Sequence, residues 1–150
     1  MVLVVADGPA GVVVRIKRLH PDVRMPSYAH SGDAGLDVYS RELRTLEQGE
    51  PYLFRLGFAT EIPAGFVGLV CDRSSLGLRG VRVLGGVIDS SFRGEWGVIL
   101  VNLTRREVLV RPGDKIAQVL FFPVARAVLE EATDLGVSSR RDRGFGSSGR

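Results

Sequence analysis

The high glycine content is the feature that most restricts the fold of this chain, in which 19 of 150 residues are glycine. Glycine readily adopts the positive φ angles that many tight turns need, and here it separates short apolar runs such as residues 66–71 and 98–103. The chain has no internal repeat, no heptad pattern and no amphipathic helix longer than a turn or two. Short strands at a spacing of about 10 residues with glycine-rich turns predict an all-β sandwich or barrel.

Runs of apolar residues place the expected strands along the chain. Residues 85–95 predict a β-hairpin, because the apolar Val87 and Ile88 run into Asp89 and two serines before the chain becomes apolar again. The other expected strands are residues 12–19, a short strand that contains Asp37, and residues 52–62, 66–71, 98–103, 108–110 and 115–124, with a last edge at 128–132.

Composition narrows the possible chemistry. A hydrophobic fraction of 45% and a charged fraction of 25% are those of an ordinary globular domain with a buried core. His20 and His30 are the only histidines, and neither has a second ligand at helical spacing, which argues against a histidine metal site or a Ser-His-Asp triad. A hydrolase built on this chain therefore uses a carboxylate with an exogenous cation, or works without histidine.

The cysteine content indicates the cellular compartment of the protein, and its net charge indicates the kind of partner that it binds. Cys71 is the only cysteine, so no disulfide framework exists and a reducing, cytoplasmic location is expected. Asp7 interrupts an N-terminus without a basic leader, and no apolar run approaches the roughly 18 residues that a membrane span needs. A net charge of +3 and a pI of about 9.5 suit an anionic partner without distinguishing a nucleic acid from a nucleotide.

Two acids allow both a structural and a functional interpretation. Asp37 stands inside an apolar strand, where an unpaired carboxylate is costly. It is either an edge residue that faces water or a carboxylate aimed into a site. Asp89 is either the cap of a turn or a functional acid at the end of a strand.

The segment Arg73-Ser74-Ser75 also has two interpretations. Either serine is a suitable N-cap for a single helical turn that ends at Gly77 or Gly80. The segment is then a capped connector with a surface arginine. Alternatively, the free N–H groups, the hydroxyls and the arginine form a cradle for phosphate.

The C-terminal residues differ in composition from the rest of the chain. We predict a barrel domain over residues 1–137 and a flexible, basic arm over residues 138–150, since this arm is polar and rich in small residues. Disorder is the common outcome for such a segment. Phe145, flanked by glycine and followed by Ser147 and Ser148, is also suited to closing over a base and its phosphates.

Five segments, in their order and spacing, resemble the five motifs of the trimeric dUTP pyrophosphatase (dUTPase) family, a resemblance that extends from about Val12 to the C-terminus. The segments are Asp33-Ala34-Gly35-Leu36-Asp37, Arg73-Ser74-Ser75-Leu76, Gly86-Val87-Ile88-Asp89 with Phe92-Arg93-Gly94-Glu95, Pro112-Gly113-Asp114-Lys115-Ile116-Ala117-Gln118, and Arg143-Gly144-Phe145-Gly146-Ser147-Ser148-Gly149. The resemblance implies a jelly-roll subunit, a homotrimer and three active sites, each built from three chains. The implied reaction is hydrolysis of dUTP to dUMP and pyrophosphate with Mg²⁺, by attack of water on the α-phosphate. This reaction keeps uracil out of DNA and supplies dUMP for thymidylate synthesis. It requires neither nucleic acid nor membrane as a partner.

The resemblance also implies roles in the reaction. Asp89 matches the acid that activates the attacking water, and Arg73, Ser74 and Ser75 match the phosphate-binding segment. Asp37 and Gln118 match side chains near the metal and triphosphate, acting indirectly through metal-bound water.

Further roles concern the nucleoside and the arm. The backbone from Gly86 through Val87 and Ile88, with Gly97, matches the uracil slot, and Phe92 matches the ring that lies against deoxyribose. In the arm, Phe145 matches the ring that stacks on the base. Gly146, Ser147 and Ser148 match the clasp on the γ-phosphate. By spacing the arm's phosphate-binding arginine is Arg140, with Arg141 and Arg143 as alternatives.

The chain departs from the family pattern at Phe92, at Val83 and in the arm, where Arg141 and Arg143 interrupt the glycines that usually follow the phosphate-binding arginine. Phe92 stands where Tyr is common, and Val83 stands where many bacterial members have Asn. The nearest rival family is dCTP deaminase, which places a catalytic Glu where this chain has Ile99. A non-catalytic trimeric β-domain has no need of Asp89, Asp37 or the arm, all of which this chain keeps.

Overall fold

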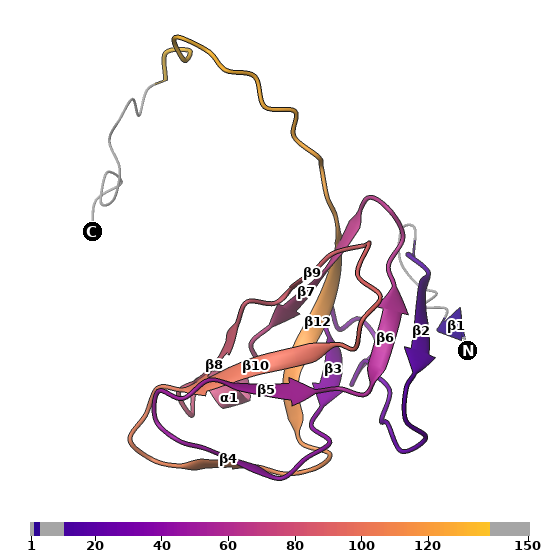
Figure 1. The fold of residues 1–150 in the computed structure, drawn as a ribbon, viewed down its shortest axis with the longest axis vertical. Coiled ribbons are helices and arrows are strands. Elements are labelled where there is room, and N and C mark those ends of the chain that lie inside the picture. The colour runs from indigo at the N-terminus through magenta and orange to yellow at the C-terminus, as the bar shows by residue number, and fades with distance from the viewer. Residues whose placement is uncertain (1, 4–10, 139–150) are drawn as a thin grey trace.

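The chain folds into a barrel of short strands with one short helix among the described residues (Figure 1). The computed structural model describes residues 2–3 and 11–138. The all-β prediction is confirmed. The elements are β1 (Val2–Leu3), β2 (Val14–Arg18), β3 (Leu36–Tyr39), β4 (Arg44–Leu46), β5 (Tyr52–Arg55), β6 (Phe58–Glu61), β7 (Phe66–Cys71), α1 (Ser74–Gly77), β8 (Val81–Leu84), β9 (Val87–Ile88), β10 (Gly97–Asn102), β11 (Val108–Val110) and β12 (Lys115–Pro123).

Two antiparallel sheets supply most of the core. One has the strand order β3-β12-β7-β9 and the other the order β5-β10-β8. Val70 and Val119 from the first sheet pack in the same hydrophobic cluster as Phe54 and Leu100 from the second. The small sheets β1-β2-β6 and β4-β11 complete the barrel.

Strand β12 is central to the first sheet, and its register sets the position of two polar residues. Gln118 of β12 lies opposite Asp37 of β3 on one side and opposite Cys71 of β7 on the other. Strand β7 ends at Cys71, so Arg73 follows directly beside this polar pair. The sheet therefore brings together residues from three of the motifs.

The predicted strands agree with the structure at several positions and differ at others. Strands β7 and β11 have the predicted bounds. The single strand expected over residues 52–62 is wrong, because the chain breaks into β5 and β6 at Gly57, where φ is +75°. A Cβ atom there would lie 2.4 Å from the Val23 side chain, so glycine is needed for both conformation and space.

The hairpin predicted for residues 85–95 is also wrong in its pairing. Strand β9 pairs with β7, Gly68 opposite Ile88, whereas β8 pairs with β10, Val83 opposite Leu100. The chain thus crosses from one sheet to the other at Gly86, which has a φ of +108°. A Cβ atom on Gly86 would lie 2.5 Å from the Val70 carbonyl oxygen, and the Gly86 carbonyl accepts a hydrogen bond from Val70 N at 2.8 Å.

The chain leaves the barrel after β12, and residues 124–138 extend away from it (Figure 1). The edge strand expected at residues 128–132 is wrong, since this stretch has no strand pairing. Val128 and Leu129 are 94% and 93% exposed. The boundary between residues 137 and 138 lies at the end of the described chain and stays a prediction.

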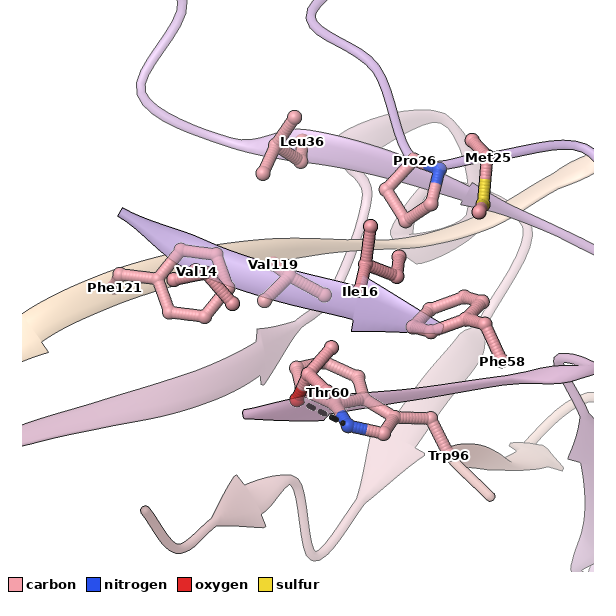
Figure 2. A pocket seen from close by; sticks show the side chains of 10 residues that line it. All are labelled: Val14, Ile16, Met25, Pro26, Leu36, Phe58, Thr60, Trp96, Val119 and Phe121. Carbon is pink, nitrogen blue, oxygen red and sulfur yellow. Dashed lines mark hydrogen bonds between the residues drawn. The ribbon is translucent and has the colours of Figure 1, made fainter. Parts of the chain in front are cut away.

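A small apolar cavity lies between β2, β6 and β12 (Figure 2). Its volume is about 50 Å³, and its lining includes Val14, Phe58 and Val119. The indole Nε1 of Trp96 donates a hydrogen bond to Thr60 Oγ1 at 2.9 Å on its wall. None of the described residues that line this cavity is charged, which makes it a gap in core packing and not a site for a nucleotide. In the described part of the chain, no helix has the length and apolar character to cross a membrane.

Candidate functional site

The segment after β7 forms the turn on which the candidate phosphate-binding residues lie. Arg73 occupies the N-cap position of α1 in extended backbone conformation, and no side chain of the described residues caps the helix. The prediction that Ser74 or Ser75 caps this turn is therefore wrong. Both serines are exposed, and Ser75 Oγ lies 3.5 Å from Arg73 Nη1.

Asp37 is a buried carboxylate between two cations. Its side chain is 9% exposed, with Oδ1 at 3.0 Å from Arg73 Nε and Oδ2 at 2.6 Å from Lys115 Nζ. These pairs explain how an acid is accommodated inside β3, because a buried charge requires partners. Of the two interpretations of Asp37, the edge residue that faces water is excluded.

Gln118 is held beside this ion-paired group. Its Nε2 donates a hydrogen bond at 2.8 Å to the backbone oxygen of Asp72, the residue before Arg73. A Cβ atom on Gly35 would lie 2.4 Å from Gln118 Oε1, so the glycine leaves the space that this amide occupies.

These residues line one cleft of about 400 Å³, which we call the Arg73 cleft. Its walls include Asp37, Arg73, Ser74 and Gln118, together with His30 and Asp33 of the preceding loop. Ser75 lies on the other side of Arg73, in a neighbouring hollow that Lys115 and Arg79 also line. The structure therefore brings most of the predicted phosphate and metal residues together.

Asp89 lines a second cleft, of about 560 Å³, which we call the Asp89 cleft. Val87, Ser90 and Ser91 share this cleft with residues of β7 and with Arg126 of the extended segment. The turn is closed by a hydrogen bond from Phe92 N to Asp89 O at 3.1 Å, and Arg93 Nη1 donates to Ser90 O at 2.6 Å. Asp89 is exposed, as an acid that must meet water and substrate would be.

Phe92 and the two glycines of the proposed nucleoside slot lie around this loop. The Phe92 side chain is 41% exposed, and its Cζ would lie 2.6 Å from a Cβ atom on Gly94. A Cβ atom on Gly97 would lie 2.5 Å from Leu53 Cδ1. The ladder between β8 and β10 ends at Leu84 opposite Ile99, before it reaches Gly86 and Gly97.

The two clefts lie toward opposite ends of β7 and share no lining residue. Phe66 and Val67 at the start of this strand line the Asp89 cleft, whereas Arg73 follows its end. At about 3.3 Å per residue, a strand of this length spans roughly 20 Å. One copy of the chain therefore does not bring Asp89 to Arg73, Asp37 and Gln118.

Cys71 and the metal-ligating side chains add two constraints on the chemistry. Burial, with a further contribution from the Asp72 carboxylate, raises the pKa of the Cys71 thiol, which disfavours the nucleophilic thiolate. Among residues 2–3 and 11–138, no three His, Cys, Asp or Glu side chains cluster as a metal site would require.

Sequence reasoning gave no role to several residues that shape these clefts. Lys115 pairs with Asp37, and Asp72 contacts both β8 and β12. Glu95 Oε1 accepts a hydrogen bond from Gly57 N at 2.9 Å and so anchors the end of the Asp89 loop. In the sequence, each of these residues is a charged residue next to a turn and carries no signal of its own. Lys115 and Glu95 belong to the five motif segments, and Asp72 does not. The predicted arm residues Arg140, Phe145, Gly146, Ser147 and Ser148 lie outside the described residues.

The arrangement of motifs corresponds to a known family. A family model described as dUTPase matches residues 22–149. The chain belongs to the dUTPase family. This membership confirms the predicted activity, the hydrolysis of dUTP to dUMP and pyrophosphate.

Individual dUTPases are similar to this chain over most of its length. A deoxyuridine 5'-triphosphate nucleotidohydrolase from Anaeromyxobacter sp. (strain Fw109-5) is 44% identical over 145 residues, which cover 93% of this chain and 99% of that protein. The counterpart from Mycobacterium marinum (strain ATCC BAA-535 / M) is 43% identical, with coverages of 89% and 93%. Among solved structures, the G164S mutant of the Staphylococcus bacteriophage 80alpha dUTPase with dUpNHpp is 27% identical. It has a TM-score of 0.82 and coverages of 91% and 98%. The predicted jelly-roll fold is thereby confirmed.

Proposed function

We propose that this dUTPase hydrolyses dUTP at sites that are completed between copies of the chain, with Asp89 and Arg73 of one site supplied by different copies. The observation that carries this proposal is the separation of the Asp89 cleft from the Arg73 cleft by the length of β7. A base must lie within hydrogen-bond reach of the water that it activates, directly beside the reacting phosphorus. In a single copy Asp89 is too remote from the phosphate-binding residues to do so.

Arg73, with Ser74 and Ser75, binds the phosphates in this proposal. Asp37 engages Arg73 Nε, which fixes the plane of the guanidinium while its Nη groups remain able to donate. The exposed hydroxyls of the two serines lie on the same turn. Arginine and hydroxyl donors around a transferring phosphoryl group stabilise the charge that develops in the transition state.

Asp89 is the general base. It accepts a proton from the attacking water, whose oxygen forms a bond to the α-phosphorus while the bond to the bridging oxygen of pyrophosphate breaks. The Asp89 carboxylate is exposed on a loop that Arg93 and Glu95 brace, so it is held in place and open to water. This is the geometry that a positioned base requires.

Mg²⁺ is the proposed cofactor, carried by the triphosphate and reached by Asp37 and Gln118 through water. The residues fit an indirect role, since both oxygens of Asp37 already face cations. Mg²⁺ commonly keeps several waters and binds substrate phosphates together with few protein ligands. When bound, the ion neutralises phosphate charge.

The nucleoside is proposed to lie against the backbone of Gly86, Val87, Ile88 and Gly97. The Gly86 carbonyl already accepts from Val70 N, and β9 pairs with β7 on one side. The β8–β10 ladder ends before Gly86 and Gly97, so the backbone edges that face each other beyond its end are proposed to pair with the edge of uracil. Phe92 presents an exposed ring beside this region and is proposed to exclude a 2′-hydroxyl.

A homotrimer is the proposed assembly. The outer face of β5-β10-β8 carries a cross-strand row of apolar side chains, in which Leu53 lies opposite Ile99 and Ile99 opposite Leu84. Their exposures are 42%, 37% and 40%. An apolar row on a sheet face is typical of a surface that another copy covers.

The arm completes the proposal. Phe145 stacks on the base, Gly146, Ser147 and Ser148 hold the γ-phosphate, and Arg140 is the phosphate-binding arginine, with Arg141 and Arg143 as alternatives. The proposed cellular site of the reaction is the cytoplasm.

One assay tests the reaction itself. The protein is incubated with each deoxynucleoside triphosphate and Mg²⁺, and pyrophosphate and ammonia are followed separately. Pyrophosphate from dUTP alone, without ammonia from dCTP, is the expected result. Release of ammonia from dCTP would instead support the deaminase reaction. That result is not expected, because Ile99 stands where the deaminase family has its catalytic glutamate.

A further inference from the structure

Asp72 joins three strands at the point where the phosphate-binding turn begins. Its Oδ1 accepts a hydrogen bond from Val83 N of β8 at 2.5 Å, and its Oδ2 lies 2.6 Å from Arg82 Nε. Its backbone oxygen accepts the hydrogen bond from Gln118 Nε2 of β12 at 2.8 Å. Asp72 itself directly follows the last residue of β7.

The contact with β8 crosses from one sheet to the other. Strand β8 is an edge strand of β5-β10-β8, whereas β7 and β12 belong to β3-β12-β7-β9. An edge strand presents N–H groups that need partners outside its own sheet. The Asp72 carboxylate is such a partner for Val83, so one side chain ties the end of β7 to the opposite sheet.

The peptide group between Asp72 and Arg73 is consequently held from several directions. β8 holds the Asp72 side chain, β12 holds the Asp72 carbonyl, and Asp37 of β3 holds the Arg73 guanidinium. The next residues are Ser74 and Ser75, which begin α1 without any side-chain cap of their own. Asp72 and Arg73 thus fix the start of this turn, and Leu76 anchors its end in the hydrophobic core.

We propose that Asp72 is a positioning residue for the phosphate-binding segment 73–75, acting through the hydrogen bond from Val83 N and not through its charge. Arg82 is 58% exposed, and an ion pair at such a position contributes little. The hydrogen bond from Val83 N comes from the backbone of a strand, so it fixes the direction of the Asp72 side chain. The inference rests on the proposed function in one respect, that Arg73 and its neighbouring serines bind phosphate.

Three substitutions separate the hydrogen bond from the charge. Asp72→Ala removes both, Asp72→Asn keeps an oxygen that can accept from Val83 N, and Arg82→Gln removes only the ion pair. Asp22→Ala is the control, because Asp22 is an exposed aspartate that pairs with an arginine at 3.5 Å and lines neither cleft.

Calorimetric titration with dUMP and with the non-hydrolysable analogue dUpNHpp, in the presence of Mg²⁺, provides the readout. Asp72→Ala is expected to weaken dUpNHpp binding by about 10- to 100-fold, as misplaced binding groups do, and dUMP binding by less than about threefold. Asp72→Asn, Arg82→Gln and Asp22→Ala are expected to bind both nucleotides nearly as the unmodified protein does. If Asp72 had a purely structural role, Asp72→Ala would weaken the binding of dUMP and of dUpNHpp to the same degree.

Several results would overturn the inference. Equal losses for dUMP and dUpNHpp would do so, and so would unchanged dUpNHpp binding in Asp72→Ala. If Asp72→Ala does not fold, Asp72→Asn still decides, because a loss of dUpNHpp affinity in a folded Asn variant means that charge and not the hydrogen bond is required. Arg73→Lys is titrated alongside. If Arg73→Lys leaves dUpNHpp binding intact, the proposed role of Arg73 fails. If Arg73→Lys weakens dUpNHpp binding and Asp72→Ala does not, only the role of Asp72 fails.

Discussion

Arg73 Nε lies 3.0 Å from Oδ1 of the buried Asp37, whose other oxygen contacts Lys115. The pair uses one edge of the guanidinium and leaves the other nitrogens for a ligand. Among the described residues, Arg73 Nη1 makes only long contacts, 3.4 Å to Lys115 O and 3.5 Å to Ser75 Oγ. Arg73 is thus oriented before any nucleotide binds, which lowers the entropy lost on binding.

Arg73→Lys is the first test of this arrangement. A lysine ammonium that pairs with Asp37 cannot also make a bidentate contact with phosphate. We expect kcat/KM for dUTP to fall by about 10- to 100-fold, a loss in the range set by one strong charged contact. Arg15→Lys is the matched control, since the Arg15 side chain is 73% exposed and its one ion pair within the described part of the chain is with Glu61. Steady-state kinetics that show equal, small effects for both variants would contradict a phosphate-binding role for Arg73.

Phe92→Ala tests the selection of deoxyribose. Removal of the ring is expected to open space beside the sugar and to raise the ratio of UTP to dUTP turnover, with dUTP turnover itself reduced. Phe122→Ala is a suitable comparison, because Phe122 on β12 is exposed to nearly the same degree, 43% against 41%. An unchanged ratio in a folded Phe92→Ala variant would mean that the ring does not contact the sugar.

Asn102→Ala tests the barrel without touching either cleft. Asn102 is fully buried, and its Nδ2 donates to Leu46 O and Arg106 O while its Oδ1 accepts from Thr104 N and Oγ1. Alanine removes all four of these hydrogen bonds at a fully buried position, so the free energy of unfolding should fall by about 2–4 kcal/mol. Urea unfolding at fixed protein concentration measures this change. Thr104→Val removes only one of the four Asn102 hydrogen bonds, together with two longer, exposed hydrogen bonds to the Arg106 backbone at 3.2 and 3.4 Å. It should destabilise the protein clearly less, and an equal or larger loss of stability would contradict the role given to Asn102.

Removal of residues 138–150 tests the arm. The deleted sequence is polar and rich in small residues, so the midpoint of thermal unfolding should change little. If Phe145 and the two serines close over the nucleotide, the same deletion should abolish most of the activity, because a lid excludes water and fixes the substrate. Full turnover in the truncated protein would show that the arm is not part of the site.

The sequence predicted those features that depend on local chemistry. Strand β7 has the predicted bounds because its apolar run lies between a glycine turn and the charges of Asp72 and Arg73. The pairing of β9 with β7 was missed, since it depends on contacts across the barrel that no local pattern encodes. The motif residues Asp37, Arg73 and Gln118 do meet in one cleft. The roles of Lys115 and Asp72 were not foreseeable, because only the register of β12 and the path of β8 bring them to this group.

Mixing two inactive variants tests whether Asp89 and Arg73 of one site come from different copies of the chain. Asp89→Asn should lose most turnover, since a positioned base contributes about 10²–10⁴-fold, and Arg73→Gln should lose phosphate binding. The two proteins are mixed in equal amounts, subunit exchange is confirmed by native mass spectrometry, and dUTP hydrolysis is measured. If each site takes Asp89 and Arg73 from different copies, random exchange restores both residues at about a quarter of all sites, and activity rises toward a quarter of that of the unmodified protein. Activity that stays at the level of the parent variants despite complete exchange would show that one copy supplies both residues, and would contradict the account.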